Sequence, residues 1–459
     1  MEAISNSTDD MLINDLSFKL PPSANYIVDR SSSTWHPAGS NVYKSTATKL
    51  IKIQVTGTGF LDLSTVKVLY DLYNDASGSA GTNQIRPLGS PATFISRMRI
   101  LAGGSILEDV SEYGRVHTLM KMLKPAEQID MDNCEGFGVP DMRTVELDKN
   151  NFFGINPGEH QTAMFKPCSG LLQSGKMIPL SLCPLTFEFE VVSTATDPIQ
   201  SEESGAGTDD LTNANTSTNW HIENVMIKAD VLKLDNQLEN SYMQHALEGK
   251  ALTINFPTYV SQMQSILSGT NGQQKVQLSV TRALSRLAKL FVTFDNSDIR
   301  LPNTSTGATG AAQAFVKNKP WNSFYSAMEH YTEASNNKYS KNGEFEFQVS
   351  IGSKNMPDYP IRSHAEAFSQ LRKCMRAESF DITPNEYRRR KFVLGLDFEK
   401  AGAGVGFSGL NTKSGDLMNL RWQTQHAQTE AQNYPKQMHI VLVADCVCEI
   451  RDSGIQMYD

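Results

Sequence analysis

Apolar and polar residues alternate with a period of two along most of this chain, the pattern of half-buried β-strands. The clearest run is LTFEFEV at 185–191, in which every second residue is apolar. Similar first-half runs are LIKIQV at 50–55, VKVLYDLY at 66–73 and VMIKADVLKL at 225–234. The second half carries VQLSVT at 276–281, KLFVTF at 289–294, EFEFQVSI at 344–351, KFVLGLDF at 391–398, LMNLRWQT at 417–424 and MHIVLVADCVCEI at 438–450. Helical patterns are few, so we predict two antiparallel β-sandwiches and not a series of β-α-β units.

One strand–turn–helix unit occurs twice. At 93–123 an apolar strand precedes a Gly-Gly turn and an amphipathic helix, and at 345–376 the same order recurs around a Gly-Ser turn. The spacing of Asp109 with Glu112, and of Ser363 with Glu366, is that of a capping box. The predicted apolar faces also match, with Tyr113, Val116 and Met120 in the first helix and Phe368, Leu371 and Met375 in the second. The alignments differ by one residue, so the repeat alone leaves duplication and coincidence equally open.

The patterns divide the chain into an N-terminal arm at 1–47, a first β unit with its connecting helix at 48–250, and a second β unit at 251–459. The first segment is polar and punctuated by proline, which predicts an extended arm. Its isolated aromatic residues Trp35 and Tyr43 suggest an anchor under a neighbouring molecule. A Gly- and Pro-rich excursion is expected at 124–175.

The segment 194–219 is poor in apolar residues and rich in turn formers. This composition fits an interdomain linker or a long surface loop. A helix is predicted at 236–248, immediately before the boundary between the two β units.

Composition narrows the class of protein. The chain has 459 residues, of which 39% are hydrophobic and 20% charged, as in ordinary globular proteins of two or three domains. A formal charge of −8 argues against a surface that coats nucleic acid broadly. No apolar run reaches the ~20 residues of a membrane-spanning helix. The sequence starts with the polar and acidic MEAISNSTDD, whereas a signal peptide would be basic and then apolar.

These features predict folding in a reducing compartment, and the cysteines agree with it. None of the six lies in a CxxC pair, so we expect buried thiols and no zinc site. Cys446 and Cys448 are two residues apart, which places them on one face of a strand.

Three apparent catalytic motifs lack the context that their chemistry requires. GLLQSGK at 170–176 resembles a phosphate-binding loop, but Met177 stands where a magnesium-binding hydroxyl is needed and a strand follows. GVGFSG at 404–409 matches a dinucleotide fingerprint, but no helix start follows it. The nine histidines, among them His117 and His364, form no HExxH pair, and no GxSxG elbow is present. We therefore predict no enzyme activity, no catalytic residue, no cofactor and no metal site.

The strongest basic feature is YRRRK at 387–391. It suits contacts to phosphate or to an acidic partner surface. A solvated loop and strand entrance beside Phe392 is the favoured interpretation, because only four charges are adjacent.

Several segments together resemble the major capsid proteins of polinton-like viruses and virophages, which are double-jelly-roll proteins. The central one is RMRILAGGSILEDVSEYGRVHTLMKML at 97–123. It is accompanied by FKLPPSANYIVDRSSSTWHPAGSNVY at 18–43, MIPLSLCPLTFEFEVV at 177–192 and CVCEIRDSGIQMYD at 446–459. The resemblance covers most of the chain in order and spacing, and the segments 124–175 and 194–219 depart from it.

The resemblance implies an all-β fold of two tandem eight-stranded jelly rolls with a few short helices and long loops. Three chains would form a pseudo-hexagonal capsomer, and many capsomers would tile the icosahedral shell of a double-stranded DNA virus. The implied partners are copies of the chain, a penton protein and minor capsid or cement proteins, with a possible weak contact to packaged DNA. The implied location is the virion, after assembly inside the host cell.

Two other classes of function remain open at this stage. A glycan-binding adhesin made of two β-sandwiches would use loop aromatic residues such as Trp321, Phe324 and Tyr325 as stacking platforms. A β-sandwich hydrolase would need a carboxylate pair, and no pair stands out in the sequence.

Overall fold

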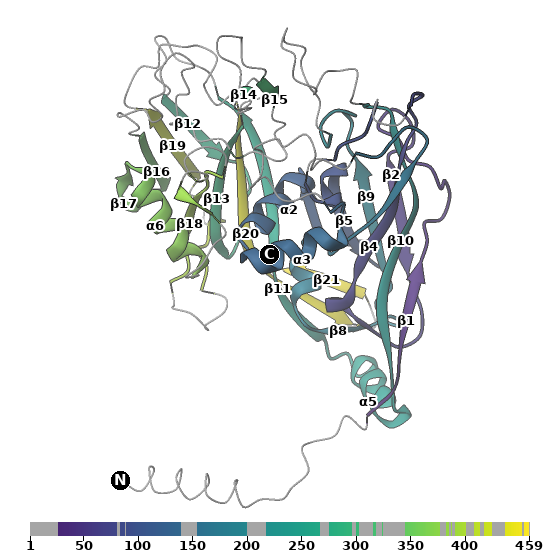
Figure 1. Ribbon diagram of the computed structural model, residues 1–459. Helices are drawn as coiled ribbons and strands as arrows, with labels where there is room; N and C mark the ends of the chain where they lie inside the picture. Colours follow the sequence, from purple (N-terminus) through teal and green to yellow (C-terminus); the bar gives the residue numbers. More distant parts are fainter. Residues whose placement is uncertain are drawn as a thin grey trace, which may run out of the picture.

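A computed structural model shows two β-sandwich units side by side (Figure 1). The residues that it describes are 26–79, 83–87, 89–138, 154–199, 217–266, 275–295, 300–302, 315–317, 324, 345–376, 382–384, 387, 391–400, 408–413, 417–424, 437–451 and 454–458.

The first unit consists of two antiparallel sheets. One sheet has the strand order β7-β4-β10-β3-β8, with β1 paired to β10, and the other has the order β2-β9-β5-β6. The bounds are β1 Ile27–Trp35, β2 Leu50–Val55, β3 Phe60–Asp62, β4 Lys67–Asn74, β5 Ile95–Ala102, β6 Ser105–Ser111, β7 His160–Phe165, β8 Met177–Pro179, β9 Leu185–Val191 and β10 Trp220–Leu234.

The second unit repeats this construction. Its sheets have the orders β11-β20-β13-β18, with β21 paired to β20, and β12-β19-β16-β17. The bounds are β11 Leu252–Ser265, β12 Lys275–Val280, β13 Leu287–Asp295, β16 Phe345–Ile351, β17 Lys354–Ile361, β18 Leu394–Asp397, β19 Met418–Thr424, β20 Gln437–Arg451 and β21 Gly454–Tyr458. The small hairpin of β14 (Arg300–Pro302) and β15 (Phe315–Lys317) lies at one end of the molecule (Figure 1).

Both units have one and the same topology. When the eight strands that they share are numbered 1 to 8 in chain order, one sheet reads 1-8-3-6 and the other reads 2-7-4-5 in each unit. This is a jelly roll, in which two sheets close over one core. The predicted fold of two tandem eight-stranded jelly rolls is thereby confirmed. In this numbering β1 of the first unit corresponds to β11 of the second, and β6 corresponds to β17.

The duplicated segment is confirmed by this topology. β5, β6 and helix α2 (Tyr113–Met122) occupy the same positions in the first unit as β16, β17 and α6 (His364–Met375) in the second. The α6 cap is confirmed too, because the Ser363 side chain accepts a hydrogen bond from the Glu366 backbone N–H.

The predicted capping box of α2 is wrong. Asp109 lies within β6, where its carboxylate binds the Arg97 guanidinium at 2.6 and 2.7 Å. Glu112 is the N-cap residue in the left-handed conformation, and its side chain makes no capping hydrogen bond. The strand pairing and the ion pair hold Asp109 outside the helix.

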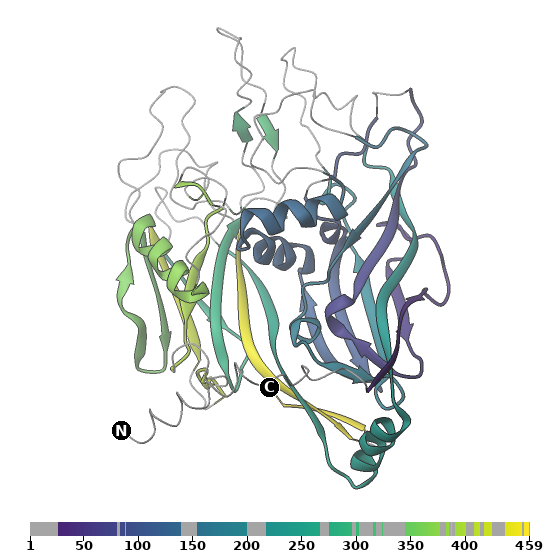
Figure 2. The ribbon, with the colours of Figure 1, turned by 60° about the horizontal axis from the view of Figure 1, so that its bottom comes forward.

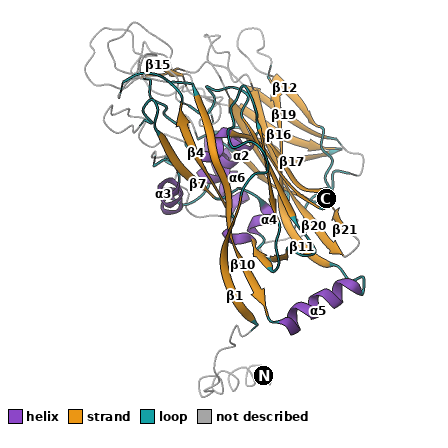
Figure 3. Ribbon diagram, turned by 90° about the vertical axis from the view of Figure 1, so that its right-hand side faces the viewer, coloured by secondary structure: helices purple, strands orange, loops and turns teal. Residues whose placement is uncertain are grey.

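The other helices lie in connections. The excursion at 124–175 contains α3 (Ala126–Glu135), β7 and the short α4 (Gly170–Gln173). The segment 194–219 connects β9 to β10, which both belong to the first unit, so it is not a linker between the two units. Helix α5 (Asn236–Leu247) connects β10 to β11 and lies at the end of the molecule opposite β14 and β15 (Figures 1 and 3).

Residues 26–47 of the expected arm belong to the first jelly roll. β1 pairs with β10 at eight positions. The Trp35 indole donates to the Thr56 carbonyl at 3.0 Å, and Tyr43 is 2% exposed and bridges Ile222. Both aromatic residues are therefore held within their own unit, and the anchor under a neighbouring molecule stays a prediction. We place the start of the first jelly roll at β1, and residues 1–25 lie outside the described residues.

Each core follows from the alternation of the strands. In β9 the residues Leu185, Phe187, Phe189 and Val191 are fully buried between the two sheets of the first unit. Trp422 fills the corresponding place in the second unit, against the rings of Phe294 and Phe345 at centroid distances of 4.6 and 5.0 Å. Aromatic contacts of this geometry add to the burial of apolar area.

Candidate functional site: the contact between the two jelly rolls

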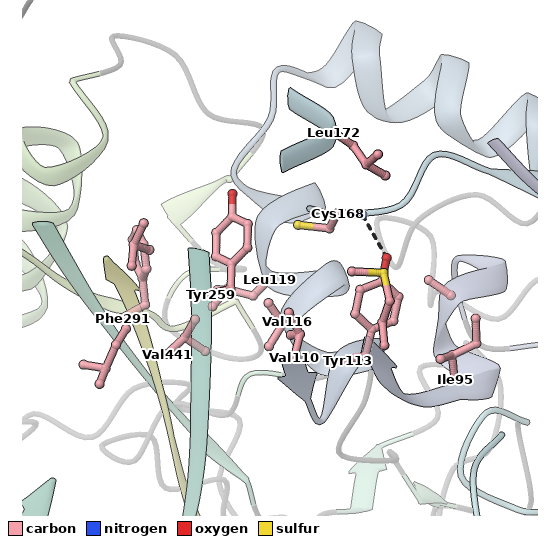
Figure 4. Packing of buried hydrophobic residues seen from close by; sticks show 14 of the residues in the cluster. Ile95, Val110, Tyr113, Val116, Leu119, Cys168, Leu172, Tyr259, Phe291 and Val441 are labelled. Carbon is pink, nitrogen blue, oxygen red and sulfur yellow. Dashed lines mark hydrogen bonds between the residues drawn. The ribbon is translucent and has the colours of Figure 1, made fainter. Parts of the chain in front are cut away.

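The most elaborate polar construction in the described structure lies where the two units meet. Helix α2 stands between them (Figure 2), and eight of its ten residues are buried. By contrast, its counterpart α6 buries three of twelve. The difference arises because α2 is covered by its own unit on one side and by the second unit on the other. Figure 4 shows the apolar residues of this contact, with Tyr259 of β11 next to Val116 and Leu119 of α2.

A buried carboxylate organises the first unit's side of the contact. Glu108 on β6 is 1% exposed. It accepts hydrogen bonds from the Ser169 hydroxyl, from the Gly170 N–H at 3.0 Å and from the Leu171 N–H at 3.4 Å. These donors form the start of α4, so Glu108 holds that short helix against the second unit.

The position of Gly170 brings the two backbones together. A methyl group built on this residue would overlap the carbonyl oxygen of Pro257 on β11 and would lie 2.6 Å from its carbonyl carbon. Cys168, two residues before Gly170, extends the contact. The Cys168 N–H donates to the Tyr113 hydroxyl at 2.8 Å (Figure 4), and the Cys168 thiol is hydrogen-bonded to Tyr259.

Burial controls the protonation of this cluster. Removal from water raises the pKa of Glu108 to about 7, although its three hydrogen-bond donors oppose the rise. Burial likewise raises the pKa of Cys168 to about 12 and the pKa values of Tyr113 and Tyr259 well above their usual value. The tyrosines and the thiol are therefore neutral at physiological pH, and only Glu108 titrates near it.

Arg115 reaches from α2 into the second unit. Its side chain is completely buried, and its guanidinium donates to the Phe294 carbonyl at 3.0 Å and to the Thr293 hydroxyl at 3.4 Å. The same group lies 5.1 Å from the centre of the Phe324 ring, which is a cation–π contact. Burial and the charge of Arg115 hold the pKa of His439 well below its usual value, so that imidazole is neutral. Arg115 thus ties the two cores to one another.

Two hydrogen bonds lie at the edge of the contact. The Ser261 hydroxyl of β11 donates to the Ser111 carbonyl at 2.5 Å, and the Ser105 hydroxyl donates to the Ile455 carbonyl of β21 at 3.4 Å. Together with the buried cluster, they join the two jelly rolls to one another.

We expect replacement of Arg115 by methionine to lower the free energy of unfolding by about 3 kcal/mol, because buried acceptors lose their donor. Urea denaturation followed by tryptophan fluorescence measures this loss. Arg97→Met is the matched control, since Arg97 is paired with Asp109 at the surface and its loss costs less than about 1 kcal/mol. Equal effects of the two substitutions would contradict the role of Arg115.

We also expect stability to fall as the pH rises from about 4.5 to about 7. The folded state keeps the Glu108 proton over this range, whereas the unfolded carboxyl, with an ordinary pKa of 4.5, releases it. This difference amounts to about 3 kcal/mol. Melting midpoints measured from pH 4.5 to 8 show the slope, and Glu108→Gln should flatten it. The exposed Glu127→Gln should leave it unchanged, and an unaltered slope in Glu108→Gln would refute the assignment.

The structure accounts for part of the apparent catalytic motifs that sequence analysis set aside. GLLQSGK forms α4 and its C-terminal turn, with Gly170 facing Pro257 and not a phosphate. Gly404 and Gly406 of the second motif lie outside the described residues. Gly409 packs on backbone atoms of Arg286 and Leu287. His117 is buried within the first unit with its Nε2 3.3 Å from the Lys166 carbonyl, and its pKa is lowered to about 3, chiefly by burial.

The remaining candidates are fixed within the fold or lie outside the described part. Tyr387 is buried and its hydroxyl donates to the Val393 carbonyl, Lys391 is buried, and residues 388–390 of the basic run are not described. Phe324 is 1% exposed, so it offers no stacking platform for a sugar, and residues 321 and 325 are not described.

All six cysteines are thiols, five of them buried, with Cys134 exposed. The described residues contain no cluster of His, Cys, Asp and Glu able to hold a metal ion, and none of the helices in those same ranges is long and apolar enough to span a bilayer.

Sequence analysis did not foresee the roles of Glu108, Gly170 and Arg115 at this contact. The burial of Glu108 results from a β-bulge at Leu107, where the pairing of β5 with β6 shifts between Ile100 and Leu101. The bulge buries Leu107 and Glu108 in succession, which simple alternation does not foresee. The position of Arg115 carries no such signal, since at 3.6 residues per turn it lies on the side of the predicted helix opposite Tyr113, Val116 and Met120.

No protein-family model matches the chain, and no curated protein sequence matches it. Solved structures do. PBCV-1 VP54, as fitted into a reconstruction of the virophage Sputnik, superposes with a TM-score of 0.63 at 12% identity, covering 96% of this chain and 100% of that one. A chain of the Sputnik virophage structure gives 0.62 at 10% identity, with 96% and 90% coverage. The Faustovirus major capsid protein gives 0.54 at 9% identity, with 95% and 93% coverage.

These likenesses and the shared strand order define the class of fold. The chain is a double-jelly-roll protein. Its fold is that of viral major capsid proteins, as the resemblance in the sequence implied.

Proposed function

We propose that this chain is a major capsid protein that assembles as a homotrimer of pseudo-hexagonal outline and tiles the icosahedral shell of a double-stranded DNA virus. The observation that carries the proposal is the pair of topologically identical jelly rolls held as one body. Three such chains supply six similar wall elements, enough to fill a six-sided lattice site with one gene product. The fold shared with PBCV-1 VP54 and the Faustovirus major capsid protein supports it.

The architecture suits a mechanical function. Jelly rolls close their sheets over a core and so resist edge-to-edge aggregation. The buried contacts of Glu108 and Arg115 make the angle between the two units a fixed property of the monomer. A shell needs that rigidity, because small errors in subunit angle accumulate over a closed surface.

The proposal includes the partners and location expected from the sequence. Copies of the chain would be the principal partners, and a penton protein and minor capsid or cement proteins would complete the shell. Assembly would take place inside the host cell, with the protein then resident in the virion. A weak contact with packaged DNA through residues 388–390 stays a prediction.

Sedimentation velocity and negative-stain electron microscopy of the purified chain test the proposal. We expect a species of three times the 50.8 kDa chain mass, with a pseudo-hexagonal outline and threefold symmetry. A folded protein that stays monomeric at all accessible concentrations would refute it. A glycan array run beside it is expected to show no selective binding.

A further inference from the structure

One end of the second jelly roll is basic. Several parts of the chain lie there, at the end of the unit away from the hairpin of β14 and β15. They are the β12–β13 connection at 281–286, the turn from β16 into Lys354 of β17, the last turn of α6 with Arg376, and residues 398–400 and 408–413 of the β18–β19 connection. The described residues of these parts are here named the basic end. Their cations are Arg282, Arg286, Lys354, Arg372, Lys373, Arg376, Lys400 and Lys413.

Strand pairing brings the first two of these parts to the same end of one sheet. Val280 at the end of β12 pairs with Met418 of β19, and Met418 pairs with Ile351 at the end of β16. The β12–β13 connection and the β16–β17 turn therefore leave the sheet side by side. Neighbouring strands lie about 4.8 Å apart, so the ends of the four strands from β12 to β17 span about 15 Å.

Backbone hydrogen bonds fix the connections to one another. Leu287 and Leu410 exchange both of their hydrogen bonds, at 2.8 and 2.9 Å. The Thr412 N–H donates to the Leu284 carbonyl at 2.8 Å, and the exposed Lys413 follows directly. The cations of the two connections are thus carried on a hydrogen-bonded frame.

Cations outnumber carboxylates at the basic end. Arg376 binds the carboxylates of Asp397, at 3.5 Å, and of Glu399. Asp445 lies next to Arg286, whose carbonyl accepts from the Asp445 N–H at 3.0 Å. These three carboxylates stand against eight cations among the described residues, in a chain whose formal net charge is −8. Positive charge is therefore concentrated at this end against the balance of the whole chain.

The basic run at 387–391 lies at the other end of the same unit. The Tyr387 ring lies 6.4 Å from that of His364 at the start of α6, and Lys391 bridges Phe324. Helix α6 then leads to Arg376 and β18 leads to residues 398–400, both at the basic end. The two basic features therefore point in opposite directions, and the described members of the run, Tyr387 and Lys391, are buried.

We propose that the basic end binds the phosphates of packaged double-stranded DNA, so that this end of the second jelly roll faces the inside of the shell. The inference rests on the proposed function and assigns its DNA contact to a surface other than residues 388–390. The two jelly rolls lie side by side (Figure 1), so a ring of three chains places all three basic ends on one of its faces. A duplex carries one negative charge per about 1.7 Å of its axis, and contacts to phosphates do not depend on base sequence.

Three variants of the full chain test this assignment. The first removes three exposed cations of the basic end: Arg282→Gln, Lys400→Gln and Lys413→Gln. The matched control removes three exposed cations elsewhere on the same jelly roll: Lys275→Gln, Arg362→Gln and Arg421→Gln. The third replaces the arginines at 388–390 by glutamine. Circular dichroism melting verifies that each variant is folded, and sedimentation velocity verifies that each is a trimer.

Binding is measured by fluorescence anisotropy of a labelled duplex of about 30 base pairs between 50 and 200 mM salt. We expect the first variant to bind at least about tenfold more weakly than the wild-type chain. Its slope of log K against log salt should be smaller by about 2 to 3, because each lost phosphate contact contributes about 0.9. The control and the 388–390 variant should keep the wild-type slope, and a duplex of unrelated sequence should bind equally well.

The opposite results are equally specific. A trimeric wild-type chain that does not bind the duplex, or a first variant that binds as the wild-type chain does, would overturn the assignment. So would loss of binding in the 388–390 variant alone, or binding to phosphatidylserine vesicles or polyglutamate in place of the duplex. A monomeric wild-type chain would instead refute the proposed function, so the two failures are distinguishable.

Discussion

Alanine in place of Gly170 is expected to weaken the joint between the two jelly rolls by at least about 3 kcal/mol. The added methyl group overlaps the backbone carbonyl of Pro257, and neither backbone can yield cheaply. α4 must then move away from β11, which disturbs the donors of the Glu108 carboxylate at Gly170 and Leu171. One methyl group thus acts on packing and on a buried charge network together.

The melting midpoint measures this effect, with an expected drop of roughly 6 to 12 °C for a unit of this size. Limited proteolysis should also cut the variant faster between the units. Gly57→Ala is the matched control, because a methyl group there meets Leu180 at an ordinary distance of 3.6 Å. Equal melting midpoints in the two variants would show that the close approach at Pro257 does not hold the units together.

Alternation of residue types predicted the strands because a half-buried strand imposes it directly. β9 and β16 are strands with one face in a core, and apolar residues occupy every second position along both of them. The α6 cap was predictable for a similar reason, since Ser363 and Glu366 interact within one helical turn.

Features that depend on distant parts of the chain were not predictable in this way. The α2 cap failed because Asp109 is held by Arg97 across a strand pair, an interaction that no local window contains. Gly170 resembled part of a phosphate-binding loop because both roles need a glycine where backbones or ligands approach closely. What determines its role is Pro257, 87 residues further along the sequence and directly opposite in the fold.

The predicted arm illustrates the same limit. The first strand of a jelly roll pairs with the last, here β1 with β10, so about 200 residues separate the partners. Ser31 to Thr34 are small and polar and show no alternation. Pairing with β10 holds these residues in a strand that their own sequence does not predict.

Deleting residues 1–40 is therefore expected to abolish folding of the first jelly roll, whereas deleting residues 1–25 should be tolerated. The longer deletion removes β1, the Trp35 hydrogen bond and the ion pairs of Arg30 with Asp62 and Asp230. It also exposes one side of β10 as a long unpaired edge, which favours aggregation. The shorter deletion leaves every described contact in place.

Soluble yield, circular dichroism and the melting midpoint distinguish the two deletions. The shorter form should melt within about 2 °C of the full chain, since it keeps β1 and the contacts of that strand. The longer form should be insoluble or should lack the cooperative transition of the first unit. A soluble, cooperatively melting longer form would mean that β1 is dispensable.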